Sequence, residues 1–233
     1  MDEQAGRVAL LAGASGLVGS RLLPLLLGAT EYSRVLALTR RPLLLDHARL
    51  ANRVVRFDAG LEKQLAGLRC NDAFCCLGTT LREAGGQEGF RAVDQDLVLK
   101  IARVAQAAGA ERLVVISSVG ASETSKNFYL RVKGETERAL ERMQFAALDI
   151  MQPSVLLGLR RDVRPLEFLA QVVFWCVNPL LLGTLARFRG MAAGEVAAAM
   201  LGAARGGRRG INRYTAPQLR ALAPAGVRQS ARL

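Results

Sequence analysis

Histidine, tryptophan and cysteine are scarce in this chain of 233 residues, which contains one His, one Trp and four Cys. Two of the cysteines, Cys75 and Cys76, are adjacent and therefore poorly placed to bond each other, and no pair has the Cys-x-x-Cys spacing of a metal site. The single histidine, His47, falls in a predicted surface loop. We therefore expect no disulfide framework and no metal site, and we expect a reducing, cytoplasmic location.

The chain also lacks the features of exported, fibrous and disordered proteins. Its first residues are acidic where a secretory signal needs positive charge, and glycines interrupt the apolar run that follows. A content of 51% hydrophobic and 22% charged residues, with only 7 Pro, is typical of a soluble globular protein. We expect one domain that spans residues 1–233.

Acidic residues become rare toward the end of the chain. Residues 150–233 contain 12 Lys or Arg against 3 Asp or Glu, and the whole chain has a formal net charge of +12. This asymmetry indicates either an acidic partner or membrane surface, or a bias toward arginine, which supplies 28 of the 32 basic residues. The basic residues are not interleaved with aromatic residues as in single-strand binders, and we expect no nucleic-acid partner.

Short apolar runs alternate with helical periodicity through the first two thirds of the chain. Strands that alternate with helices form a parallel sheet with right-handed crossovers. We therefore predict an α/β fold with a doubly wound parallel sheet in three layers (α/β/α). The predicted strands cover residues 8–12, 34–39, 53–57, 73–77, 112–116 and 146–151, and the predicted helices cover residues 17–27, 89–108 and 128–143.

The last third is less regular, and we expect it to form a small extension that supplies the wall of a substrate site. Helices are predicted at residues 165–177 and 192–204, and a short added strand at residues 213–215. Residues 168–185 are strongly apolar, but polar residues within this segment argue against a membrane span. The segment indicates core packing or a substrate lid, a dimer surface, or a peripheral contact with a membrane or protein through residues 166–190. We expect a monomer or a homodimer.

A glycine-rich turn joins the first predicted strand to the first predicted helix. Gly13 permits a tight turn, Gly16 lets the backbone approach a pyrophosphate, and Gly19 lets helix and strand pack closely. The N-terminus of the helix adds free N–H groups and a positive dipole end. Because the turn lies inside a β-α-β unit, it predicts a dinucleotide site formed by Gly13, Ala14, Ser15, Gly16, Leu17, Val18 and Gly19.

Arginines, rather than an acidic residue, follow the second predicted strand. Asp or Glu at this position binds the ribose 2′-hydroxyl of NAD, whereas Arg40 and Arg41 would fork onto a 2′-phosphate. The sequence therefore favours NADP(H) over NAD(H).

Two further segments fall at the carboxyl ends of predicted strands, where ligands of doubly wound folds lie. Asp58 follows the third strand and would contact the adenine amino group or cap the next helix. Leu77 ends the fourth strand, and Gly78 and Thr79 follow it; they would line the cofactor cleft or form a plain turn.

A tyrosine and a lysine lie four residues apart in the helix predicted after the fifth strand. Tyr129 and Lys133 would share one helix face, either as a solvated pair or as a proton-transfer group. A free phenol has a pKa of about 10, and an ammonium group nearby favours the phenolate. The tyrosine could then exchange a proton with a carbonyl oxygen during hydride transfer, while Ser117 or Ser118 at the neighbouring strand end orients that oxygen.

Together these motifs resemble the short-chain dehydrogenase/reductase superfamily, and more narrowly its atypical branch typified by the Tat-interacting-protein oxidoreductases. The likeness is carried by residues 13–19, 75–80, 89–108 and 116–135, and it covers about residues 7–200. It implies a Rossmann-type fold with NADP(H) in the glycine turn.

The resemblance also implies a role for the tyrosine, the lysine and the two serines. Tyr129 would be the acid/base, Lys133 the partner of the ribose and the phenol, and Ser118 the donor to the substrate oxygen, with Ser117 in reserve. All four would lie in the catalytic cleft.

The loop after the sixth strand would border the nicotinamide through Pro153, Ser154 and Val155. The family usually has Arg before this proline, whereas this chain has Gln152.

Two functions are consistent with these observations. The first is an NADP(H)-dependent oxidoreductase that transfers a hydride between the nicotinamide and the carbonyl or alcohol of a hydrophobic small molecule. The alternative is an NADPH-binding sensor with little or no turnover, which acts through a protein or membrane partner.

Overall fold

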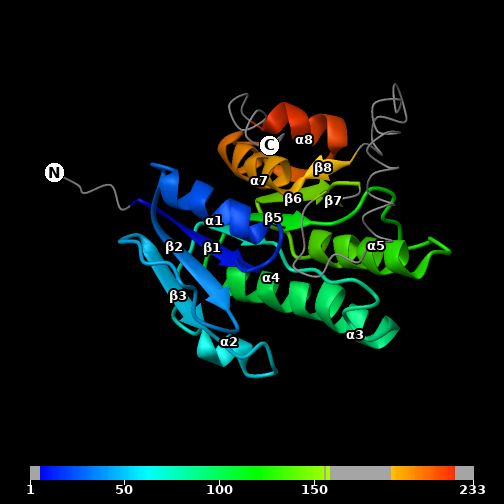
Figure 1. Cartoon of the computed structure of the whole chain (residues 1–233), viewed down its shortest axis with the longest axis horizontal. Coiled ribbons are helices and arrows are strands. Elements are labelled where there is room, and N and C mark those ends of the chain that lie inside the picture. The colour runs from blue at the N-terminus through cyan, green and yellow to red at the C-terminus, as the bar shows by residue number, and fades with distance from the viewer. Residues whose placement is uncertain (1–5, 155, 158–189, 224–233) are drawn as a thin grey trace.

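The computed structural model describes residues 6–154, 156–157 and 190–223, which are coloured in Figure 1. Seven parallel strands form the main sheet in the order β3-β2-β1-β4-β5-β6-β9, so the predicted doubly wound parallel sheet is confirmed. The strands are β1 (Arg7–Ala12), β2 (Tyr32–Thr39), β3 (Leu50–Val54), β4 (Asp72–Cys75), β5 (Arg112–Ile116), β6 (Ala147–Gln152) and β9 (Gly210–Thr215).

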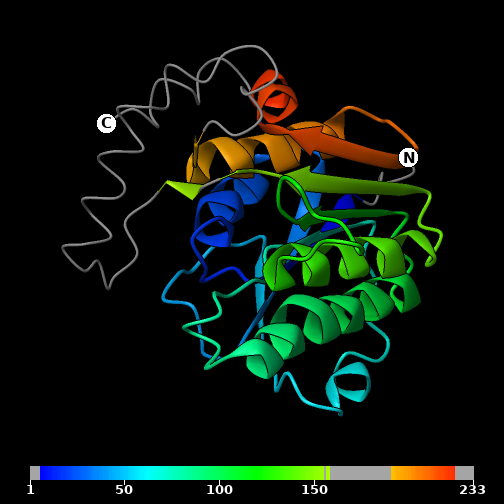
Figure 2. The same ribbon diagram turned by 90° about the vertical axis from the view of Figure 1, so that its right-hand side faces the viewer.

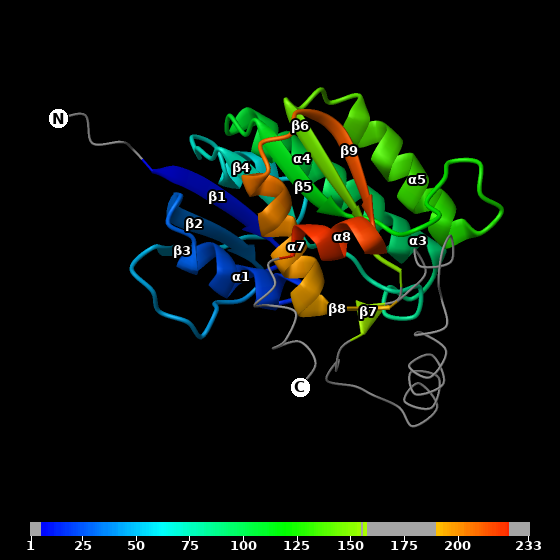
Figure 3. The ribbon, with the colours of Figure 1, turned by 90° about the horizontal axis from the view of Figure 1, so that it is seen from above.

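Helices cover both faces of this sheet and give the three predicted layers (Figures 1 and 2). One face carries α1 (Gly19–Gly28), α7 (Ala193–Arg205) and α8 (Ala216–Leu222), which lie over the strands in Figure 3. The other face carries α2 (Leu61–Gln64), α3 (Gln87–Arg91), the π-helical turn η1 (Ala92–Leu97), α4 (Val98–Ala107) and α5 (Phe128–Glu141).

Alternate residues of each strand enter opposite cores. Leu11 of β1 and Val114 of β5 pack beneath α1, α7 and α8, whereas their neighbours Leu10 and Leu113 pack against α4 and α5. All four side chains have 0% exposure. Strands that are buried on both faces consist of continuous apolar residues, and this explains why the apolar runs predict the central strands well. The prediction for β5 is confirmed at both ends.

The prediction for the third strand is wrong by three residues. Residues 53–57 are predicted, but β3 spans Leu50–Val54, with Leu50 opposite Val35 and Val54 opposite Thr39. β3 lies at the edge of the sheet and has one neighbour. An edge strand is partly solvated and tolerates polar residues, so the apolar pair at Val54 and Val55 does not mark its centre.

The helix predicted at residues 89–108 is one continuous helical stretch of α3, η1 and α4, with a π-helical turn in the middle. A π turn inserts an extra residue and rotates the buried face of the helix. As a result Asp94 and Val98 are buried, whereas Val93 and Leu97, which the predicted apolar stripe includes, are only half-buried. The helix ends as predicted before Gly109, which has a φ of +86°.

Two of the elements predicted for the last third of the chain are confirmed, and one of them is a strand of the main sheet. The helix predicted at residues 192–204 is α7, and the predicted added strand is part of β9, which pairs with β6. Two short strands, β7 (Leu156–Leu157) and β8 (Met191–Ala192), form a small parallel pair of their own. The helix predicted at residues 165–177 and the apolar segment 168–185 lie outside the described residues. No helix of the described ranges is long and apolar enough to cross a bilayer.

The cysteines of the described segments are free thiols. Burial raises the pKa of Cys70 to about 12 and that of Cys75 to about 11. Both thiols are therefore protonated near neutral pH, and neither is activated as a nucleophile.

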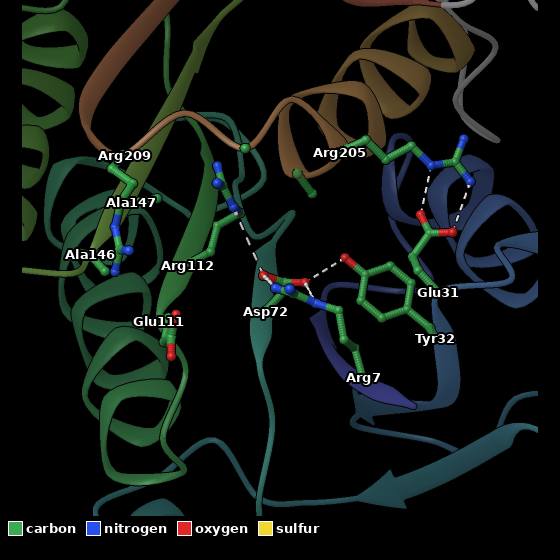
Figure 4. A pocket seen from close by; sticks show the side chains of 12 residues that line it. Arg7, Glu31, Tyr32, Asp72, Glu111, Arg112, Ala146, Ala147, Arg205 and Arg209 are labelled. Atoms are coloured by element: carbon green, nitrogen blue, oxygen red, sulfur yellow. Dashed lines mark hydrogen bonds and ion pairs between the residues drawn. The ribbon is translucent and has the colours of Figure 1, made fainter. Parts of the chain in front are cut away.

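Charged side chains are paired at the amino edge of the sheet, the edge where the strands begin (Figure 4). Asp72 is 1% exposed and accepts hydrogen bonds from Arg7 Nε (3.1 Å), Arg7 NH2 (2.7 Å) and the Tyr32 hydroxyl (2.7 Å). Arg112 pairs with Asp149, and burial raises the pKa of Asp149 even with this partner. These pairs fasten β1, β2, β4, β5 and β6 to one another.

A further ion pair at this edge joins α7 to the residue just before β2. Arg205 of α7 donates from Nε and NH2 to the Glu31 carboxylate at 2.6 and 3.2 Å. A hollow of about 460 Å³ lies here. Its lining contains four arginines and three carboxylates: Arg7, Arg112, Arg205, Arg209, Glu31, Asp72 and Glu111. Because Arg7, Arg112 and Arg205 are each paired with a carboxylate, most of this charge is used within the protein.

We expect Glu31→Gln to destabilise the protein at pH 7 and to have little effect in acid. The hydrogen bonds from Arg205 lower the pKa of Glu31 below its ordinary value of 4.5. The pair therefore contributes stability above that ordinary value and loses it as the pH falls through the lower pKa of the folded state. Because both side chains are partly exposed, the loss at pH 7 should not exceed about 1 kcal/mol.

Urea unfolding at pH 7 and at about pH 3 measures this difference. Glu111→Gln is the matched control, because Glu111 lies at the same edge and is exposed. An equal effect of Glu31→Gln at both pH values would contradict the assignment.

Candidate functional site

The carboxyl edge of the sheet, the edge where the strands end, contains the predicted site residues. The strand order reverses between β1 and β4, because the chain leaves β1 through α1 on one face and leaves β4 toward α4 on the other. In doubly wound sheets, ligands bind in the crevice that forms at this reversal.

The glycine turn follows β1 at this point and is packed too closely for side chains. Gly13 has a φ of +86°, and a Cβ on it would lie 2.8 Å from the Cys76 carbonyl oxygen. A Cβ on Gly19 would lie only 2.0 Å from the Gly13 oxygen. Ser15 and Gly16 are exposed between these buried glycine contacts. The turn therefore presents bare backbone to the solvent side of the crevice.

At the start of α1, the N–H groups of Ser20 and Arg21 already donate to the carbonyl oxygens of Gly16 and Val18, so an anion would bind the N–H groups of the turn just before them. Val18 stands at the N-cap, and no side chain caps the helix. Helix N-terminal N–H groups that lack a cap can donate to a phosphate, and the helix dipole favours negative charge there. The residues present thus fit a pyrophosphate at the turn, in agreement with the prediction for residues 13–19. Ala14, Leu17 and Val18 supply backbone to the same turn.

Arg40 and Arg41 are exposed directly after β2, as predicted. Within the described ranges neither guanidinium group has a hydrogen-bond or ion-pair partner. Both are thus available to an external anion.

The predicted role of Asp58 at the adenine has a structural alternative. Asp58 Oδ1 accepts a hydrogen bond of 2.8 Å from the Gly60 N–H at the entrance of α2, and Oδ2 lies 3.4 Å from Arg56 Nε. The N-cap of α2 is Gly60, and no side chain of the described residues caps this helix, so Asp58 holds the turn before α2 and is not its cap. Contact with adenine stays a prediction.

The loop after β4 is tied to the helical stretch by a residue that the sequence analysis missed. Asp94 of η1 is 1% exposed, and its Oδ2 accepts a hydrogen bond of 2.8 Å from the Thr79 N–H. Its Oδ1 lies 2.7 Å from Lys133 Nζ. Gly78 is adjacent, since a Cβ there would lie 3.4 Å from Asp94 Oδ1. Asp94 lies four residues after Phe90 and four residues before Val98, which are both buried. This spacing is the sequence signal that places Asp94 on the same buried helix face.

Tyr129 and Lys133 lie on α5 and face the same edge. Asn127 caps α5 by accepting a hydrogen bond of 3.2 Å from the Leu130 N–H, which fixes where the helix begins. The Tyr129 ring packs against Phe90 at 5.3 Å between centroids. Its hydroxyl has no hydrogen-bond partner among the described residues.

Lys133 is 5% exposed and is held in place by two oxygen atoms. Besides Asp94, it donates to the Ile116 carbonyl oxygen at 3.4 Å. An ammonium group has three N–H donors, so one remains for a ribose hydroxyl or a phenol. The solvated-pair alternative for these two residues is not supported, because the lysine is buried.

The two serines after β5 have different environments. The Ser117 hydroxyl is buried and donates to Glu137 Oε1. Ser118 is half-buried, and its hydroxyl makes only a long contact of 3.5 Å with the Val119 carbonyl oxygen. The geometry therefore favours Ser118 as the donor to a substrate oxygen and leaves Ser117 engaged within the protein.

The loop after β6 contains the last group of predicted residues. Pro153 is buried, and its carbonyl oxygen accepts a hydrogen bond of 3.0 Å from the Val119 N–H, which joins this loop to the loop of the serines. Ser154 follows it and is half-buried, whereas Val155 lies outside the described residues. Gln152 donates to both oxygens of Glu137, at 2.9 and 3.1 Å.

No group of three or more His, Cys, Asp or Glu in the described segments could hold a metal ion. The fold and the glycine turn thus define a Rossmann-type protein with a dinucleotide crevice. The profile of the family described as NAD(P)H-binding matches residues 13–156. The chain belongs to this NAD(P)H-binding family, in the Tat-interacting-protein-like branch of the atypical short-chain dehydrogenase/reductases.

Two curated relatives carry this likeness over most of the chain. Protein HTATIP2 of Rattus norvegicus is 40% identical over 168 residues, which cover 70% of this chain and 69% of the relative. Protein FMP52, mitochondrial, of Debaryomyces hansenii is 34% identical over 185 residues, which cover 77% and 79%.

Solved structures with the same fold are much more distant in sequence. MoeE5 in complex with UDP-glucose and NAD superposes with a TM-score of 0.63 at 18% identity, over 88% of this chain and 74% of that chain. The Bordetella bronchiseptica enzyme WbmG in complex with NAD gives 0.64 at 15% identity, over 92% and 74%. These similarities show the fold alone.

We expect Gly19→Ala to destabilise the protein by about 1–3 kcal/mol, the usual effect of overpacking. The new Cβ would lie 2.0 Å from a backbone oxygen, so the turn must move. Gly28→Ala is the matched control in the same helix, because nothing lies within 4 Å of its Cβ position. Thermal unfolding should show a lower Tm for the first variant alone, and wild-type stability of Gly19→Ala would contradict the close packing.

Proposed function

We propose that this protein is an NADP(H)-dependent oxidoreductase that acts on the carbonyl or alcohol group of a hydrophobic small molecule. The observation that carries this proposal is the arrangement of Tyr129 and Lys133 beside the dinucleotide crevice, with Lys133 buried and fixed 2.7 Å from Asp94. A surface pair of the same residue types would not need a buried acid to hold the lysine.

The residues of this edge would divide the work of the reaction. The bound dinucleotide supplies or accepts the hydride. Its pyrophosphate would lie on the backbone of residues 13–19, and Arg40 and Arg41 would bind the 2′-phosphate. Leu77, Gly78 and Thr79 would line the crevice between β4 and α5.

Proton transfer would belong to Tyr129. Its hydroxyl would donate a proton to the substrate oxygen during reduction and remove one during oxidation. Lys133 would favour the phenolate through its remaining N–H donor, and Ser118 would orient the substrate oxygen.

The wall of the substrate site rests on sequence alone. Residues 166–190 are proposed to cover the nicotinamide side, and their apolar character supports a hydrophobic substrate. A peripheral contact with a membrane or protein through the same segment, and a cytoplasmic location, also remain proposals. The FMP52 relatives are named as mitochondrial proteins.

A sensor that binds NADPH with little turnover is the second candidate. The basic end of the chain supports it, since residues 150–233 contain 12 Lys or Arg against 3 Asp or Glu and could bind an acidic partner. The sensor and the oxidoreductase share the cofactor site and differ in whether Tyr129 transfers a proton.

We expect NADPH to bind more tightly than NADH by about tenfold or more, because each charge-assisted hydrogen bond to the 2′-phosphate contributes about 1.5–3 kcal/mol. Isothermal titration of the full-length protein with each nucleotide measures the two Kd values. Equal affinities would remove the role of Arg40 and Arg41. Absence of binding by either nucleotide would overturn the function as a whole.

We expect Tyr129→Phe to lower kcat by about 10²–10⁴-fold, the usual contribution of a general acid, and to leave the Kd for NADPH unchanged. Consumption of NADPH with menadione as the carbonyl probe measures turnover. Ser117→Ala is the control, because the Ser117 hydroxyl is engaged by Glu137. A Tyr129→Phe variant that retains turnover would contradict the acid/base role, and a wild-type protein that binds NADPH and reduces no carbonyl of a broad panel would favour the sensor.

A further inference from the structure

Arg40 and Arg41 lie in a turn between β2 and β3. Both ends of this turn are hydrogen-bonded to one side chain of the edge strand β3, that of Asn52. Asn52 of β3 lies opposite Ala37 of β2 in the ladder. Asn52 has this position because β3 spans Leu50–Val54; the predicted strand over residues 53–57 would leave Asn52 outside the sheet.

The amide group of Asn52 contacts β2 on one side of the arginines and the loop on the other. Its Nδ2 donates to the Ala37 carbonyl oxygen at 3.1 Å and to Thr39 Oγ1 at 2.8 Å. Its Oδ1 accepts a hydrogen bond of 2.8 Å from the Leu43 N–H. Asn52 thus closes a bridge over Arg40, Arg41 and Pro42.

The arginines have little else to fix them. Neither side chain has a partner within the described ranges, so their direction depends on the backbone of the turn. Beyond Leu43 the loop is solvated, since Leu44 is 105% exposed. The next anchor along the chain is Arg49, which donates to the Ala29 and Tyr32 carbonyl oxygens at 2.9 and 3.1 Å.

We infer that Asn52 is a positioning residue that sets the preference for NADPH over NADH. It fixes the turn between Thr39 and Leu43 so that Arg40 and Arg41 present their guanidinium groups in one direction, and it does not itself touch the nucleotide. Pre-ordering of this kind reduces the entropy lost when the arginines bind a phosphate. The inference rests on the proposed function, since it assumes a 2′-phosphate beside these arginines.

The test compares the ratio of the Kd values for NADPH and NADH in the full-length wild type and in variants. Asn52→Ala removes the three hydrogen bonds and leaves every proposed nucleotide contact in place. We expect its Kd for NADPH to rise about fivefold to tenfold, which is less than the loss of one whole charge-assisted hydrogen bond because both arginines remain, while its Kd for NADH changes less than about twofold. Thr39→Val removes one of the bonds with little change in volume and should give a smaller change in the same direction.

Val54→Ala is the control for general damage to the edge strand, because Val54 is an exposed residue of β3. A merely structural role would weaken both nucleotides equally or change only Tm, and it would leave the ratio unchanged. If the wild type prefers NADPH and both Asn52→Ala and Thr39→Val keep the same ratio, the inference is overturned and the proposed function stands. If the wild type binds neither nucleotide, or binds both equally, the proposed cofactor site fails and the inference fails with it.

Discussion

The ion pair between Asp94 and Lys133 connects the three parts of the chain that make the candidate site. Asp94 belongs to the helical stretch after β4, Lys133 to α5, and the second oxygen of Asp94 reaches the backbone of Thr79. Both charges are buried, at 1% and 5% exposure, so neither is stable there without the other. The buried carboxylate of Asp94 thus fixes the position of Lys133. Because Tyr129 lies one turn earlier on the same helix, its position is fixed as well. The loop after β4 is held by the same carboxylate, so this loop and α5 are fixed to one another by Asp94.

How far the sequence predicts this molecule depends on whether local pattern or tertiary contact decides each element. The residues of β5 are apolar on both faces and bounded by polar residues, and their strand is predicted at both ends. β3 is an edge strand, where polar residues such as Asn52 are tolerated, so its apolar residues indicate the wrong register. Asp94 is missed for a different reason: the π turn changes the helical period, and an ideal helix would place Val93 and Leu97 on the buried face instead.

Side-chain direction is the other property that sequence does not contain. Ser117 and Ser118 are adjacent and identical in chemistry, and only the strand geometry turns one toward Glu137 and leaves the other near the cleft. By contrast, the glycine turn is predictable from the sequence because its close packing requires residues without a side chain. The backbone contacts of Gly13 and Gly19 exclude any Cβ, so only glycine fits at these two positions, and glycine is easily recognised in the sequence.

Gln152, where the resemblance implies an arginine, shares its carboxylate partner Glu137 with an arginine of another strand. Glu137 is buried at 5% exposure and needs a cation or several donors. Gln152 supplies an amide, and Arg213 of β9 supplies the charge from Nε at 3.1 Å. β9 therefore does more than extend the sheet, because it brings a guanidinium group to a carboxylate next to the serine pair.

The two edges of the sheet show why charge alone does not identify a site. At the amino edge, Arg7, Arg112 and Arg205 each face a carboxylate, and together they line a hollow. At the carboxyl edge, Arg40 and Arg41 face no acid of the described residues, and the helix N-terminus beside the glycine turn lacks a capping side chain. Arginines that are paired inside the protein stabilise it, whereas arginines that are unpaired but held in direction can bind an anion from solution. The arginines of the amino edge are therefore explained by the ion pairs that they form, and Arg40 and Arg41 by the 2′-phosphate that we propose the chain binds.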